Sequence, residues 1–223
     1  VAELAAGLIP SLRLAASPLV VSLVVAPSIA ELGPDDACPR IVTDPDLSYD
    51  RLDCDVDLVL ATTPPAPGLD RLRFPRLPIT AQLPADHFLA AQDEIGLAQL
   101  AGENLVLAAD SGHVQTRLTG LLAVSGLTPA TASTVDTGQL AQALAAAGRG
   151  VAVVTDEPRF DLVAVPITTD DQASLAVEVY AAWKPEHHAA PMVAACARRL
   201  QRSTAARLDR RRAIRAQRAE SAA

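Results

Sequence analysis

Two short segments of the sequence combine residue types that bind anions at the start of a helix. Ser111-Gly112-His113 and Thr137-Gly138 each lead into a stretch with the apolar spacing of a helix. The first turn of a helix offers free backbone N–H groups and partial positive charge, which favour a carboxylate. Ser and Thr before a helix are also ordinary N-caps, and both interpretations stay open from these residues alone. Asp110 and Asp136 would repel an anion, so we interpret them as caps.

Three threonines extend this candidate site. Thr62 and Thr63 follow the apolar run 56–61, and Thr155 ends the run 150–155. Ligands of open α/β sheets bind beyond the carboxyl ends of the strands. If these runs are strands, the three hydroxyl groups stand where a small ligand would bind.

Other chemistry has little support in the sequence. It has no G-x-S-x-G, P-loop, H-E-x-x-H or G-x-G-x-x-G pattern. His187 and His188 are adjacent, whereas two metal ligands on one helix face need a spacing of four. Cys38 and Cys54 flank an acidic stretch, which disfavours a reactive thiolate. We therefore expect a protein that is not an enzyme and that has no metal and no cofactor.

The elements that position these residues form an alternating pattern. Apolar runs predict strands at 19–26, 56–61, 77–83, 104–108, 131–135, 150–155, 162–166 and 174–183. Helical spacing predicts helices at 2–16, 113–124, 138–147 and 189–219, a helical turn at 95–100, and a short helix opened by Ser28-x-x-Glu31. This alternation predicts an α/β fold with mostly parallel sheets.

One of these runs has an alternative interpretation. Residues 19–26 could be the apolar region of a signal peptide. Glu3 stands where such a peptide would be cationic, and Pro18 and Pro27 bracket the run as they would a buried strand. We favour the strand.

Composition narrows the class of protein. With 50% hydrophobic and 20% charged residues, the chain is too apolar to be disordered. No apolar stretch approaches the ~20 residues that span a bilayer. Three cysteines without a C-x-x-C pattern fit a reduced, cytoplasmic protein.

The charge is unevenly distributed. The formal net charge is −7, yet nine of the 19 basic residues lie between Arg198 and Arg218. This basic end has two interpretations, a solvated helical extension or a weak, salt-sensitive contact with DNA phosphates. We favour the solvated extension.

The order of the segments resembles the effector-binding domain of LysR-type bacterial transcription regulators. The resemblance is carried by LIPSLRLAASPLVVSLVV, CDVDLVL, LPITAQLPADHFLA, IGLAQLAGENLVLAADSG, SGLTPATAS, LAQALAAAGRGVAVVTD, LVAVPITTD and VEVYAAWKPEHHAAPMVAACARRL. It implies two Rossmann-like lobes of the type II periplasmic-binding-protein kind, joined by two crossover segments. We place lobe I at 1–61 and 157–200, lobe II at 65–152 and a basic extension at 201–223.

The resemblance also implies a function. We expect a non-enzymatic domain that senses a small organic, anionic effector in the cleft between its lobes; the alternative is a free-standing solute-binding protein of a transporter. The family's N-terminal helix-turn-helix and first strand are expected to be missing, so that DNA would be contacted only through a separate domain or weakly through the basic end. A homodimer is implied, with Leu8 and Leu12 of the helix 2–16 facing Leu118 and Leu122, or their neighbours, of a partner.

Overall fold

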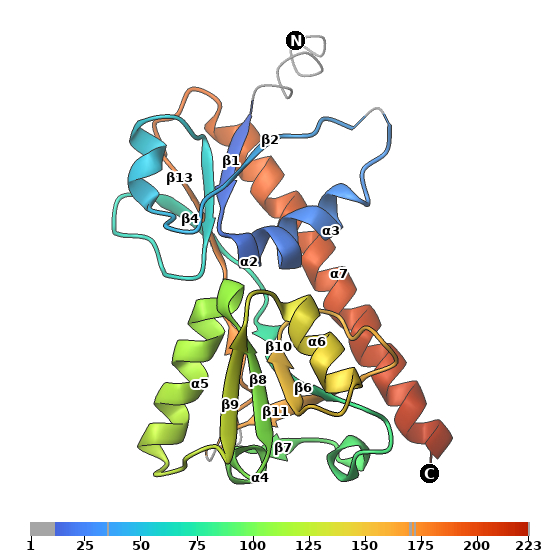
Figure 1. Cartoon of the computed structure of the whole chain (residues 1–223). Helices are drawn as coiled ribbons and strands as arrows, with labels where there is room; N and C mark the ends of the chain where they lie inside the picture. Colours follow the sequence, from blue (N-terminus) through green and yellow to red (C-terminus); the bar gives the residue numbers. More distant parts are fainter. Residues whose placement is uncertain (1–11, 35, 170, 172, 223) are drawn as a thin grey trace. The chain divides into compact units, whose positions relative to one another are not determined.

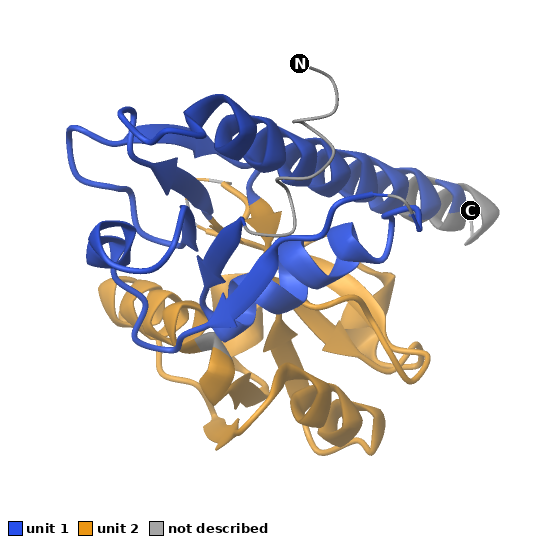
Figure 2. Cartoon of the chain, turned by 90° about the horizontal axis from the view of Figure 1, so that it is seen from above, with its two compact units in different colours: residues 1–76, 178–223 blue, residues 77–177 orange. Residues whose placement is uncertain are grey.

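The computed structural model describes residues 12–34, 36–169, 171 and 173–222. The chain forms two compact units, shown in different colours in Figure 2: Val1–Arg76 with Glu178–Ala223, and Leu77–Val177. The expected α/β fold is confirmed in both, although each main sheet mixes parallel and antiparallel strands.

Unit 1 contains a five-stranded sheet of order β2-β1-β3-β13-β4. Strands β2 and β3 run parallel to β1, whereas β13 runs antiparallel to both β3 and β4. Its elements are β1 (Arg13–Ala16), α2 (Pro18–Val20), the π-helical turn η2 (Val21–Val25), α3 (Ala26–Ile29), β2 (Arg40–Thr43), the 3-10 helix η3 (Tyr49–Asp53), β3 (Leu58–Ala61), β4 (Asp70–Arg73), β13 (Tyr180–Trp183) and α7 (Ala190–Ala222). All four residues of β3 are buried, which is typical of a central strand.

The beginning of unit 1 differs from the expected order of elements. Residues 13–16 form a strand rather than the end of a helix. Residues 2–11 of the expected helix 2–16, among them Leu8, lie outside the described residues, whereas Leu12 is described. Strand β1 therefore takes the place of the first strand expected to be missing, and it lies between β2 and β3.

The expected strand 19–26 is wrong, because this segment is helical from Pro18 to Ile29. Ser17 is the N-cap, its Oγ accepting a hydrogen bond from the Val20 backbone N–H at 3.5 Å, and Pro18 takes the first position, which proline favours. Val20, Val24 and Ser28 are buried at a spacing of four, so tertiary burial overrides the strand preference of valine. Ser28 does not open a helix; its hydroxyl donates to the Val24 carbonyl at 2.6 Å.

The structure contradicts Leu12, Leu118 and Leu122 as residues of the expected dimer contact. Leu118 and Leu122 are buried, at 0% and 2% exposure, on a helix that contacts a strand of its own unit. Leu12 is buried as well, at 4%. These side chains fill the protein's own core and are not available to a partner.

Unit 2 contains a six-stranded sheet of order β7-β11-β6-β10-β8-β9 and a small ladder of β12 and β5. Its elements are β5 (Leu77–Pro78), β6 (Thr80–Leu83), the 3-10 helix η4 (Phe88–Ala91), β7 (Ile95–Gly96), α4 (Leu97–Ala101), β8 (Asn104–Ala108), the 3-10 turn η5 (Ala109–Ser111), α5 (Gly112–Val124), β9 (Thr131–Val135), α6 (Gly138–Ala146), β10 (Val151–Val154), β11 (Val163–Thr168) and β12 (Ala176–Val177). Most of the expected helices and strands of this unit are present, with small shifts at their ends. The expected strand 77–83 is instead two strands, β5 and β6, in different sheets, and the expected helical turn 95–100 begins with the strand β7.

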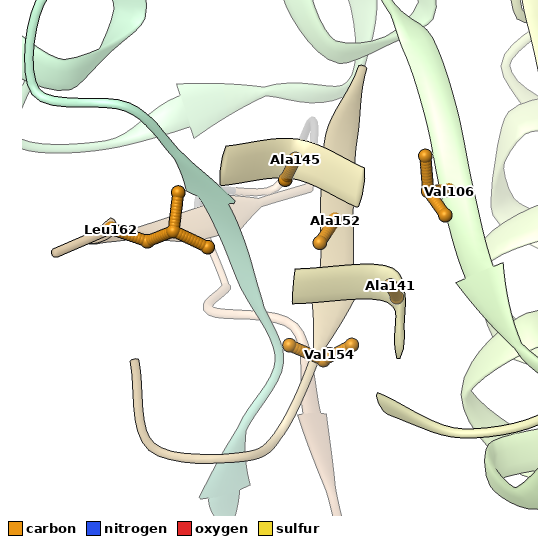
Figure 3. Close-up of a cluster of buried hydrophobic side chains, with 6 residues drawn as sticks. All are labelled: Val106, Ala141, Ala145, Ala152, Val154 and Leu162. Atoms are coloured by element: carbon orange, nitrogen blue, oxygen red, sulfur yellow. The ribbon is translucent and has the colours of Figure 1, made fainter. Parts of the chain in front are cut away.

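Alanines let α6 lie close to this sheet. Ala141 and Ala145 of α6 face Ala152 and Val154 of β10 in the close-up of Figure 3, and all four side chains are buried. Val106 of β8 and Leu162, just before β11, complete the cluster. This packing holds the N-terminus of α6 against the ends of the strands.

Both divisions between the units lie later in the chain than the expected lobe boundaries. Residues 65–76, which we placed in lobe II, belong to unit 1, because β4 pairs with β13. Residues 157–177, which we placed in lobe I, belong to unit 2, because β11 pairs with β6 and β7. The expected strand 174–183 is two strands, β12 in unit 2 and β13 in unit 1.

The basic end of the chain is only partly a solvated extension. Helix α7, the long helix in Figure 1, contacts α3 and η2 of its own unit, and Thr204 and Leu208 are buried. Arg207 donates to the Leu23 carbonyl at 2.8 Å, and Arg210 pairs with Glu31 at 2.8 Å. Residues 201–210 are thus part of unit 1.

We expect Leu208→Ala to lower the free energy of unfolding by about 2 kcal/mol, because it removes a buried side chain. Ile214→Ala is the matched control on the same helix, since Ile214 is 53% exposed, and it should change stability by no more than about 0.5 kcal/mol. Urea unfolding followed by circular dichroism measures both. Equal effects would contradict the packing of α7.

Candidate functional site

The candidate site of unit 2 lies where three parallel strands end. Strands β10, β8 and β9 are neighbours in this order and run in the same direction. Their carboxyl ends therefore meet at one edge of the sheet, and α5 and α6 both begin at this edge (Figure 1).

A backbone hydrogen bond joins the two connections that lead into these helices. The Asp110 N–H donates to the Asp136 carbonyl at 3.2 Å. Ser111 is the last residue of η5, and Gly112 and His113, both exposed, are the first two residues of α5. The segment 111–113 therefore lies beside the segment 137–138. The structure describes the backbone of Ser111 but not its side chain.

Thr137 is the N-cap of α6. Its Oγ1 accepts a hydrogen bond from the Leu140 backbone N–H at 3.3 Å, and its backbone is extended. The side chain is exposed, so the hydroxyl can still donate to a ligand. The cap and the anion-binding interpretation are therefore compatible at this residue.

A carboxylate of the protein lies close to the same helix end. A Cβ atom added at Gly138 would stand 2.5 Å from Oδ2 of Asp156, so the glycine is needed for this close approach. Negative charge at a helix N-terminus is stabilising. The N-terminus of α6 is therefore already near a negative charge, whereas the start of α5 is formed by the exposed Gly112 and His113.

Thr155 stands between β10 and Asp156 and is buried, at 3% exposure. Within the described part of the chain, its Oγ1 has no hydrogen-bond partner. A buried hydroxyl without a partner is uncommon and marks a place where a ligand or a water molecule can bind.

Two buried glutamines hold the chain that follows Thr155. Gln82 Nε2 donates to the Asp156 carbonyl at 2.7 Å, and Gln142 Nε2 donates both to the Glu157 carbonyl at 2.6 Å and to Gln82 Oε1 at 2.8 Å. Both side chains have 0% exposure. The sequence analysis missed them; their signal is an amide at an inward position of the strand 77–83 and another in the alanine-rich helix 138–147.

Thr62 and Thr63 lie in unit 1, directly after β3. The Tyr49 hydroxyl donates to the Thr63 carbonyl at 2.6 Å and fixes this connection. Burial, helped by the neighbouring Tyr180, raises the pKa of Tyr49 to about 12, so the phenol keeps its proton for this bond. Both threonines belong to unit 1.

The histidines that suggested a metal have structural contacts. Nδ1 of His187 accepts from the Ala189 backbone N–H at 3.1 Å, and its Nε2 lies 3.1 Å from Asp57 Oδ1. Among the described residues, no group of three or more His, Cys, Asp or Glu is arranged to hold a metal ion.

One family model matches most of the chain. The model described as the LysR substrate binding domain matches residues 5–205. The chain belongs to this family. A LysR substrate binding domain has a two-lobed fold of the type II periplasmic-binding-protein kind, and the match does not support the transporter alternative.

Solved structures of LysR regulators share the fold at low identity. The regulatory domain of MetR from N. meningitidis is 19% identical, with a TM-score of 0.67 over 88% of this LysR domain and 94% of that chain. OxyR from Corynebacterium glutamicum is 20% identical, with a TM-score of 0.70 over 91% of this chain and 67% of that one. The effector binding domain of BenM with its effector benzoate is 17% identical, with a TM-score of 0.63 over 87% of this chain and 90% of that one.

No curated protein sequence matches the chain. Of the helices in the described residues, none has the length and apolar character needed to span a membrane.

Proposed function

We propose that this LysR domain senses a small organic carboxylate at the edge of the unit 2 sheet and binds it without converting it. The observation that carries the proposal is the Asp110–Asp136 backbone hydrogen bond, which puts the starts of α5 and α6 side by side. The family match supports a sensing role, and the relative BenM is described with the effector benzoate.

The carboxylate is proposed to bind at the start of α5 rather than at α6. Asp156 already lies against Gly138 and would repel a second carboxylate there. Ser111, Gly112 and His113 would supply backbone N–H groups, a hydroxyl and an imidazole, and the exposed Thr137 hydroxyl would donate from the neighbouring connection. Thr155, in the same unit, would contribute a further hydroxyl group.

Calorimetric titration tests the site with benzoate and with benzamide, its uncharged analogue. We expect benzoate to bind more tightly. Thr137→Val should weaken benzoate several-fold, because one hydrogen bond to a charged acceptor is lost, and should cost about 1 kcal/mol of stability as a lost cap.

Thr119→Val is the matched control, because Thr119 is an exposed helical threonine whose hydroxyl donates to the Gln115 carbonyl at 2.8 Å. It should leave the affinity for benzoate unchanged. Equal affinities of the two variants, or tighter binding of benzamide than of benzoate, would contradict the proposed site.

The wider role follows from the family and stays a proposal. We expect a homodimer acting in the bacterial cytoplasm, in which effector binding changes the arrangement of DNA-binding domains. Sequence-specific DNA contact would come from a separate helix-turn-helix domain. The arginines of α7 would contribute at most weak, salt-sensitive contacts, since Arg199, Arg207 and Arg210 already bind groups of unit 1.

A further inference from the structure

Helices α5 and α6 begin at the same edge of the unit 2 sheet but lie on opposite faces of it. Strand β9 lies on one side of β8, and β10 lies on the other. The connection from β8 through α5 to β9 therefore runs in the opposite direction to the connection from β9 through α6 to β10. Since crossovers between parallel strands are right-handed almost without exception, the two helices cover opposite faces.

The side chains at the end of β10 are divided between these two faces. Val154, the last residue of β10, packs against α6 in the cluster of Figure 3. Side chains alternate along a strand, so Thr155 points away from α6 and toward the face of α5, and Asp156 points back to the face of α6. The closeness of the Asp156 carboxylate to Gly138, the first residue of α6, agrees with this alternation.

The register of β10 and β8 places Thr155 beside the chain that leads into α5. Val153 is paired with Leu107, so Thr155, two residues later, lies level with Ala109, the first residue of η5. Paired strands are only about 4.8 Å apart. The Thr155 hydroxyl is buried, at 3% exposure, and has no partner among the described residues. It is therefore aimed at the start of α5, where we propose that the carboxylate of the effector binds.

Asp156 adds a fixed negative charge on the other side of this point. Its side chain is partly exposed, and it lies against the start of α6. The buried Gln82 donates to its carbonyl at 2.7 Å, and the buried Gln142 donates to the next carbonyl at 2.6 Å. Buried hydrogen bonds of this kind make a connection rigid. The positive end of α5 and the carboxylate of Asp156 thus follow two neighbouring strands.

We propose that the effector of this LysR domain is an α-amino acid, whose carboxylate binds at the start of α5 and whose ammonium group binds the carboxylate of Asp156. This assignment rests on the proposed function, because it uses the same carboxylate site. In an α-amino acid both charged groups are attached to one carbon atom, so their partners must be neighbours in the fold. Paired strands provide such neighbours, since α5 follows β8 and Asp156 follows β10.

The ammonium group can bind Asp156 in addition to the interactions that Asp156 has within the chain. A carboxylate accepts up to about four hydrogen bonds, and an ammonium group donates three. A hydrogen bond between two charged groups is also stronger than one between neutral groups. A second carboxylate at this place would be repelled by Asp156, so the site favours an amino acid over a dicarboxylate.

Calorimetric titration of the full chain with three probes of one shape tests the assignment. Phenylglycine, mandelate and phenylacetate, the first two as racemates, differ only in the group beside the carboxylate, which is ammonium, hydroxyl or hydrogen. We expect phenylglycine to bind about tenfold more tightly than phenylacetate, because it adds a charged hydrogen bond, and mandelate to lie between them. In 4-(aminomethyl)benzoate a benzene ring separates the two charges, and this probe should bind no more tightly than benzoate.

Asp156→Asn should remove the preference for phenylglycine. The amide keeps the shape of the side chain but loses its charge, so phenylglycine should bind no more tightly than phenylacetate. Asp161→Asn is the matched control, because Asp161 is an exposed carboxylate of the same unit with φ +58, a conformation that asparagine also adopts. This control should keep the tenfold preference.

Two outcomes would overturn the assignment while the proposed carboxylate site stands. One is equal binding of phenylglycine and phenylacetate by the unaltered protein, with both weakened by Thr137→Val. The other is a preference for phenylglycine that survives in Asp156→Asn. If none of the carboxylates binds, the proposed function is wrong and the amino acid assignment is wrong with it. The comparison of the three probes on the unaltered protein does not depend on how well a variant folds.

Discussion

Gly150→Ala is expected to lower the free energy of unfolding by about 4 kcal/mol or more, through strain and a clash with the backbone. Gly150 has φ +146, in a region that only glycine adopts readily, just before β10. A Cβ atom added there would stand 2.3 Å from the carbonyl oxygen of Asn104, and a backbone atom of a paired strand cannot give way cheaply. Urea unfolding followed by circular dichroism measures the loss.

Gly148→Ala is the matched control for this experiment. Gly148 also has a positive φ, +70, but nothing lies within 4 Å of a Cβ atom added there. Alanine in this left-handed conformation should cost only about 1 kcal/mol. Equal decreases in the free energy of unfolding of the two variants would contradict the close approach of Gly150 to the Asn104 carbonyl.

Gln82→Leu is expected to destabilise the protein by about 3 kcal/mol, because it leaves buried polar groups without partners. The Asp156 carbonyl would lose its donor at 2.7 Å, and Gln142 Nε2 would lose the Gln82 oxygen at 2.8 Å. Gln139→Leu, at an exposed position of the same unit, is the control and should change stability by no more than about 0.5 kcal/mol.

A double-mutant cycle with Gln142→Leu makes the test sharper. Residues that share a buried hydrogen-bond network have coupled effects, so the double variant should lose less stability than the two single variants together. The predicted benzoate site should be affected too, since the two glutamines hold residues 156–157 beside α6. Additive effects would mean that the glutamines act independently.

Unit 2 was largely predictable because its signals are local. The helices 113–124 and 138–147 end at glycines and have clear apolar faces, and the strands 104–108 and 131–135 agree with β8 and β9. Parallel strands then place the starts of the two helices at one edge. The candidate residues 111–113 and 137–138 therefore lie side by side, as the residues and the topology suggested.

The start of unit 1 was mispredicted because local preference and burial conflict there. The valines of 19–26 favour a strand, yet Ser17 and Pro18 open a helix, and the pairs 19–20 and 24–25 are buried about one helical turn apart. The buried amides of Gln82 and Gln142 could not be placed from the sequence either. Their partners are carbonyl groups 74 and 15 residues away, and only the folded chain brings them together.

The aromatic residues give the two units very different optical properties. The one tryptophan, Trp183, lies in β13, and the two tyrosines, Tyr49 and Tyr180, also belong to unit 1. Tryptophan and tyrosine fluorescence therefore reports on unit 1 alone, and unit 2 contributes only the weak signal of Phe88 and Phe160. A ligand held entirely by unit 2 can be silent in a fluorescence titration, whereas a tryptophan introduced into unit 2 would make its unfolding and its ligands visible separately.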